Sequence, residues 1–97
     1  MSSPSRYRAA VFREQATVRL PHGVHAAIAH RLHQTASRFS SSVFLRRGEE
    51  IASLRSIVAV LALGLHVGAD IEVLADGTDE VDAVAAIVGM LRSTNAA

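Results

Sequence analysis

Four histidines lie close together in the first third of the chain. His22, His25, His30 and His33 are separated by two, four and two residues. An imidazole nitrogen can ligate a metal ion, and it can also act as a nucleophile that carries a transferred group. Either chemistry would require that the surrounding backbone present these rings in a suitable arrangement.

A shared metal site is disfavoured by the spacing of these histidines. If the residues from Ala26 onward form a helix, His30 lies about 140° around the axis from His25, and His33 lies about 12 Å further along it. One tetrahedral ion cannot easily gather rings that are so spread out. We therefore expect no metal site and no other cofactor, and we keep zinc binding by these histidines as a minor alternative.

His25 differs from its neighbours because it lies where a loop gives way to a helix, in the stretch PHGVHAAIAH. The first N–H groups of a helix have no acceptor within the helix, and this end of the helix dipole is positive. The backbone N–H groups of Ala26 and Ala27 could therefore hold an anion attached to the imidazole. The alternative is that the imidazole serves only as a helix cap, and position alone favours this second interpretation.

Composition limits the classes of protein to consider. A chain of 97 residues, with 49% hydrophobic and 4% aromatic residues, predicts one domain with an aliphatic core. There is no cysteine, and a net charge of +1 gives no general case for nucleic-acid binding. The basic residues are all arginines, mostly in the first 55 residues, whereas most acids follow. The longest apolar run, Ile57 to Leu63, is too short to span a membrane, so we expect a cytoplasmic protein.

Periodicity and turn residues predict seven elements between a leader, 1–11, and a tail, 93–97. The domain, 12–92, has predicted strands over 12–20, 43–46, 50–53 and 70–75, and predicted helices over 26–37 and 56–63. A third helix follows Thr78, its expected cap, with an apolar stripe of Val81, Val84, Ala85, Val88 and Leu91. The order β-α-β-β-α-β-α favours an antiparallel sheet with helices on one face.

Five short blocks in order resemble one family. They are Gly-Val-His-Ala at 23–26, Gln-Thr-Ala-Ser-Arg-Phe at 34–39, Leu-Arg-Ser-Ile at 54–57, Leu-Ala-Leu-Gly at 61–64 and Gly-Ala-Asp-Ile-Glu-Val-Leu-Ala-Asp-Gly-Thr-Asp-Glu at 68–80. They are similar to HPr, the histidine-containing phosphocarrier family of the bacterial phosphotransferase system. The resemblance implies an α+β open-faced β-sandwich, with a four-stranded antiparallel sheet and three helices on one face.

The resemblance also implies a function for three parts of the chain. His25 would accept a phosphoryl group from phospho-enzyme I, on the ring nitrogen nearer the backbone, and pass it to a sugar-specific EIIA domain. The chain would then be a covalent carrier rather than an enzyme with its own small-molecule substrate. Ser56 matches a regulatory serine that a dedicated kinase phosphorylates in some bacteria.

The apolar helix that follows Ser56 is expected to dock partners. A small domain cannot bury a helix on every side, so some of Ile57, Val58 and Leu61 should be exposed. In the family this patch receives enzyme I, EIIA domains, the serine kinase/phosphorylase and a transcriptional regulator.

The chain departs from the family pattern directly after the histidine. The usual motif is Gly-Ile/Leu-His-x-Arg-Pro-Ala, and here Ala27 and Ile28 replace the Arg-Pro pair. The missing guanidinium is the group expected to pair with the phosphoryl oxygens. His22, Arg31 or Arg55 could replace it.

Two hypotheses for function therefore remain open. The first is a phosphocarrier that works through His25. The second is a regulatory binding module with weak or no phosphotransfer, controlled by phosphorylation of Ser56.

Overall fold

The four strands of the protein form one antiparallel sheet in the order β1-β4-β2-β3. The computed structural model describes residues 11–94. Most of the predicted leader and tail, 1–10 and 95–97, lies outside the described residues. The elements are β1 (Phe12–Thr17), α2 (Ala26–Ala36), β2 (Ser42–Arg47), β3 (Glu50–Ser53), α3 (Ile57–Ala62), β4 (Asp70–Asp76) and α4 (Glu80–Arg92).

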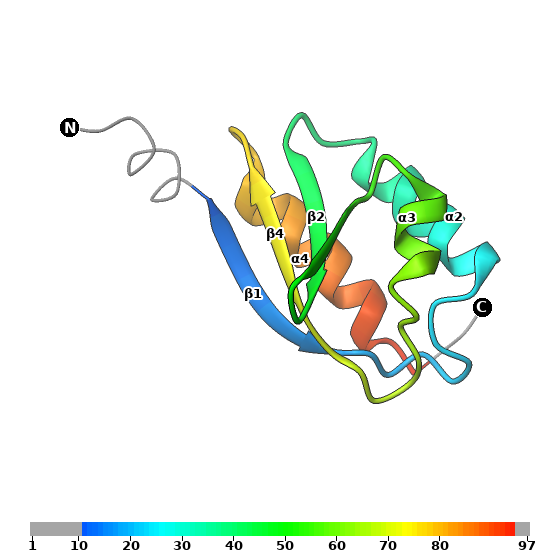
Figure 1. Ribbon diagram of the computed structural model, residues 1–97. Coiled ribbons are helices and arrows are strands. Elements are labelled where there is room, and N and C mark those ends of the chain that lie inside the picture. Colours follow the sequence, from blue (N-terminus) through cyan, green and yellow to red (C-terminus); the bar gives the residue numbers. More distant parts are fainter. Residues whose placement is uncertain (1–10, 95–97) are drawn as a thin grey trace.

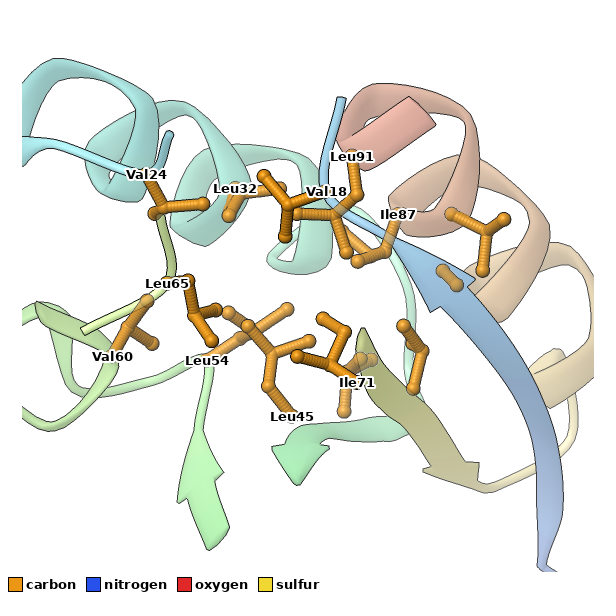
Figure 2. Packing of buried hydrophobic residues seen from close by; sticks show 14 of the residues in the cluster. Val18, Val24, Leu32, Leu45, Leu54, Val60, Leu65, Ile71, Ile87 and Leu91 are labelled. Carbon is orange, nitrogen blue, oxygen red and sulfur yellow. The ribbon is translucent and has the colours of Figure 1, made fainter. Parts of the chain in front are cut away.

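The helices α2, α3 and α4 lie on the same side of this sheet (Figure 1). Alternate strand residues such as Ala16, Leu45 and Val73 face the helices and are buried, because side chains on a strand alternate between its two faces. Figure 2 shows the resulting core, in which Val24, Leu65 and Val60 lie at one end. The predicted open-faced β-sandwich is confirmed.

The boundaries of the first strand and first helix differ slightly from those predicted. β1 ends at Thr17 rather than at Leu20, because Arg19 N donates to Leu91 O at the end of α4 and the chain thereby leaves the sheet. Val18 and Leu20 are nevertheless buried, as the alternation indicates. α2 ends at Ala36, one residue earlier than expected.

The prediction for α4 was partly wrong. Its N-cap is Asp79 rather than Thr78. Val81 is 55% exposed and Ala85 is exposed as well, whereas the buried residues are Ala83, Val84, Ile87, Val88 and Leu91. The buried face is centred near Leu91, and at 100° per residue Val81 and Ala85 lie about 80° and 120° away from it.

Arg92, at the end of α4, closes one edge of the sheet. Val18 N donates to Ala69 O, so the backbone N–H and C=O groups of Val18 point toward β4. Because these groups point toward and away from the partner strand at alternate residues, the Gln15 carbonyl points away from β4. Arg92 Nη2 donates to Gln15 O at 3.0 Å and lies 3.4 Å from Glu14 Oε2. The C-terminal helix is thus connected to the edge strand as well as to the core.

Candidate functional site

His25 is the N-cap residue of α2, and its imidazole is exposed. Its backbone is extended, with φ −91° and ψ −176°, and its side chain makes no capping hydrogen bond. The interpretation of this imidazole as a helix cap is therefore wrong. The ring is available for other chemistry.

Unbonded backbone donors lie directly beside this ring. The first amide of the helix with an acceptor is that of Ala29, which donates to His25 O at 2.8 Å. Within residues 11–94, the N–H groups of Ala26, Ala27 and Ile28 have no acceptor, and the side chains of Ala26 and Ala27 are exposed. These donors combine with the positive end of an 11-residue helix to favour negative charge near His25.

The loop before His25 is held by close backbone contacts. Gly23 has φ +69°, and a Cβ there would lie 2.6 Å from Leu65 O, so glycine alone fits without strain. Val24 N donates to Leu65 O at 2.8 Å, and the Val24 side chain is buried. The backbone that leads into His25 is therefore held against the loop between α3 and β4.

The two substitutions that follow His25 have different structural settings. Ala27 lies on the exposed first turn of α2 and contributes no charge. Ile28 is only 4% exposed and belongs to the core, so its side chain anchors the first turn of the helix. The departure at position 28 thus adds packing, whereas the departure at position 27 removes a cation.

The three candidate cations differ in their position relative to this site. His22 is exposed in the turn before Gly23. Arg31 is exposed on α2, four residues beyond Ala27 and hence on a neighbouring part of the same face. Arg55, in the turn before α3, lines a pocket with Ala36 and Ser37 at the C-terminal end of α2, which is about 16 Å along the helix from His25. The expectation that Arg55 could replace the lost guanidinium is therefore wrong.

The other histidines are not gathered around His25. His30 is exposed on α2, whereas His33 is half-buried with its Nδ1 2.8 Å from Leu54 O. His66 lies in the loop after α3 and contacts Arg47. Among the described residues, no group of three or more histidine, aspartate or glutamate side chains could hold a metal ion.

Ser56 is the N-cap of α3, and its hydroxyl accepts a hydrogen bond from Ala59 N at 3.1 Å. The serine is exposed. The six-residue helix that it caps packs against α2 (Figure 1). Ser56 and His25 therefore precede two neighbouring helices on one side of the sheet.

The predicted docking residues on α3 differ in exposure. Val58 is 77% exposed and Leu61 is 37% exposed, while Val60 and Leu63 are buried in the core. Ile57 is half-buried and packs against the core, so it contributes less to the surface than predicted. We refer to Ile57, Val58 and Leu61 as the α3 surface.

Sequence reasoning missed the role of Arg47. Its guanidinium donates to two carbonyls at the end of α3 and to the His66 ring. The partners are 16 to 19 residues away in the chain, so no local pattern could have indicated them.

Comparison with known families agrees with this architecture. Residues 12–93 match the family model described as "PTS HPr component phosphorylation site". The chain therefore belongs to the HPr family, whose members are phosphocarrier components of the phosphotransferase system. None of the helices within residues 11–94 is long and apolar enough to cross a membrane.

Solved structures of this family share the fold. The phosphocarrier protein HPr from Bacillus anthracis matches with a TM-score of 0.81 and 24% identity, covering 84% of this chain and 98% of that chain. The histidine-containing phosphocarrier protein of Mycoplasma matches with a TM-score of 0.74 and 33% identity, over 81% and 90% of the two chains. Crh, the Bacillus subtilis catabolite repression HPr, matches with a TM-score of 0.67 and 27% identity, over 87% and 100%.

Proposed function

We propose that the protein relays a phosphoryl group through His25, from phospho-enzyme I to sugar-specific EIIA domains in the cytoplasm. The observation that carries this proposal is the exposed imidazole of His25, which is not used as a cap and lies beside three unbonded amides within the described chain. Membership of the HPr family supports it.

The transfer needs only the imidazole and its two partner proteins. The lone pair of Nδ1, the ring nitrogen nearer the backbone, attacks phosphorus, and an N–P bond forms as the bond from phosphorus to the donor breaks. The second transfer reverses these roles and returns a neutral imidazole. No cofactor takes part, because the phosphoryl group passes between proteins.

The start of α2 would stabilise the phosphorylated state. Backbone N–H groups of Ala26 and Ala27 donate to the phosphoryl oxygens, which carry nearly two negative charges. His22, when protonated, is the nearest candidate in sequence for an added charge-assisted hydrogen bond. Arg31, on the same helix, is the second cation proposed to replace the guanidinium that is lost at Ala27, whereas Arg55 lies at the other end of α2.

The α3 surface is proposed as the contact for both partners. Exposed valine and leucine side chains beside a charged transfer site suit interfaces whose cores are apolar. Val58 would be the principal contact, because it is the most exposed of the three residues.

The test is phosphorylation by phosphoenolpyruvate and enzyme I, followed by intact mass measurement at alkaline pH, where phosphohistidine survives. We expect the wild type to gain one acid-labile phosphate and His25→Ala to gain none. His30→Ala is the matched control, because it removes another exposed imidazole from the same helix. Failure of the wild type to gain phosphate with an active cognate enzyme I would refute the relay.

A regulatory binding module is the second candidate function, and the exposed Ser56 favours it. Two further features support it: Ala27 supplies no cation, and the chain is similar to Crh, a protein named for catabolite repression. Phosphorylation of Ser56 by a serine kinase would place nearly two negative charges beside the α3 surface. It would weaken one partnership and favour another, such as that with a transcriptional regulator.

This second candidate is tested by incubation with ATP and an HPr-type serine kinase/phosphorylase. We expect an acid-stable phosphate on the wild type and on His25→Ala, but not on Ser56→Ala. An acid-stable phosphate without any acid-labile one would support the regulatory module over the relay.

A further inference from the structure

One guanidinium contacts three of the residues that follow α3. Arg47, at the end of β2, is half-buried. Its Nη1 donates to Leu63 O at 2.8 Å and to Gly64 O at 2.7 Å, and its Nη2 lies 3.3 Å from His66 Nε2. The last carbonyls of a helix receive no hydrogen bond from an N–H group within the helix. A positive charge at this end also interacts favourably with the helix dipole. Arg47 thus fixes the end of α3 and the start of the following loop.

The contact with Arg47 also determines the form of the His66 ring. A guanidinium has only donors, so His66 Nε2 must accept and the ring proton must be on Nδ1. This nitrogen lies 2.9 Å from Val67 O, to which it donates. Both ring nitrogens are therefore used, and the ring connects Arg47 to the backbone of its own loop.

This loop is in direct backbone contact with the segment that carries His25. Val24 N donates to Leu65 O at 2.8 Å, and a Cβ on Gly23 would lie only 2.9 Å from His66 Cα. On the other side, Gly68 N donates to Val18 O at 2.7 Å. A displacement of residues 64–68 would therefore displace Val24 and, with it, His25.

We propose that Arg47 is a positioning residue for His25. It holds the loop 64–68 in the position that keeps the imidazole beside the first amides of α2. The proposal rests on the proposed phosphoryl relay for its functional part. Arg47 acts through the Leu65 and His66 backbone rather than by touching the phosphoryl group. Because the same guanidinium binds the end of α3, it also keeps the α3 surface and His25 in a fixed relation when a partner docks.

The structural part is tested by amide hydrogen exchange in Arg47→Ala. The control is Arg46→Ala, which removes the same charge from the neighbouring residue, whose exposed side chain lies on the opposite face of β2. We expect exchange at the Val24 and Gly68 amides to accelerate about tenfold or more in Arg47→Ala relative to α4 amides, and to stay unchanged in Arg46→Ala. Equal exchange in the two variants would overturn the proposal.

The functional part is tested by the kinetics of phosphotransfer from phospho-enzyme I. We expect Arg47→Ala to lower kcat about tenfold while KM stays within about twofold, because misplacement of the acceptor affects the transition state more than docking. Arg47→Lys should be intermediate, since one ammonium group retains the charge but lacks the fork that reaches all the acceptors. A rise in KM alone would instead make Arg47 a docking residue and would overturn the positioning role.

The outcomes separate this inference from the proposed function. If the wild type accepts no phosphate, the relay fails, and hydrogen exchange alone decides whether Arg47 holds the loop. If Arg47→Ala does not fold, Arg47→Lys replaces it, because the ammonium group keeps the charge but cannot reach all three acceptors. Faster exchange at Val24 in Arg47→Lys than in the wild type would support the proposal, and unchanged exchange would overturn it.

Discussion

The carboxylate of Asp79 joins two loops at one end of the molecule. It accepts hydrogen bonds from Ser40 N at 2.9 Å, from Ser41 N at 2.9 Å and from Ser41 Oγ. These bonds, that from the Ser41 hydroxyl most strongly, lower the pKa of Asp79 below its ordinary value of 3.8. The side chain therefore connects the start of α4 to the segment before β2 in its charged form.

The lowered pKa of Asp79 predicts a contribution to acid stability. Because the unfolded chain binds this proton more readily, the contribution is complete above about pH 4 and is lost as the pH falls through the folded-state pKa. Asp79→Asn should lower the free energy of unfolding at neutral pH and weaken its decline in acid. Urea unfolding from pH 2 to 7 measures both effects, with Asp82→Asn, exposed on α4, as the control. An unchanged acid profile in Asp79→Asn would contradict the assignment.

Among the elements, α3 is short and depends on its cap. Six residues form little more than one and a half turns, which are marginal without tertiary contacts and a capping side chain. Ser56 supplies the cap, and Val60 anchors the helix in the core. The helix that is proposed to dock partners is therefore held by few groups.

Removal of this cap should be measurable. We expect Ser56→Ala to lower the free energy of unfolding by about 1 kcal/mol, because Ala59 N loses its acceptor. Ser37→Ala is the comparison, because the Ser37 hydroxyl donates to His33 O and caps no helix amide. Chemical denaturation of both variants would decide: an equal loss in the two would argue against a specific role for the cap.

The elements also show how far sequence reasoning extends. The periodicity in α2 and the turn at Gly48 were sufficient to predict the helix and the hairpin, because both signals are local. For α4 the predicted buried face was wrong in part, because ten of its 13 residues are apolar and the three charged residues are spread around the helix, so no polar face marks the exposed side. The position of His25 at a helix start was predictable from Gly23 and the alanines that follow. The contacts of Arg47 were not, because they depend on how distant segments meet.

At the scale of the whole molecule, the core and the proposed docking surface are formed by different residues. The core includes Leu32 and Ile87, both fully buried (Figure 2). Val58, in contrast, is mostly exposed. Domains of this size are stable by only about 5–15 kcal/mol, so one cavity in the core takes a large share of that stability.

Two substitutions should separate these roles. Leu32→Ala should cost about 2–5 kcal/mol of unfolding free energy, because it leaves a cavity between α2 and the rest of the core. Val58→Ser should change that free energy by less than about 0.5 kcal/mol, as expected for an exposed site. It should nevertheless weaken binding to enzyme I, measured by titration calorimetry. Tight binding by Val58→Ser would exclude the α3 surface as the main contact.

The bond from Arg92 to Gln15 also bears on how copies of this chain meet in a concentrated solution. A fifth strand that joined the outer side of β1 would need the Gln15 carbonyl, which already accepts from Arg92. It would also meet the charges of Arg92 and Glu14 halfway along the strand. Exposed strand edges favour sheet growth from one molecule to the next, and charged groups placed along them oppose it. The last turn of α4 therefore opposes extension of the sheet at its β1 edge.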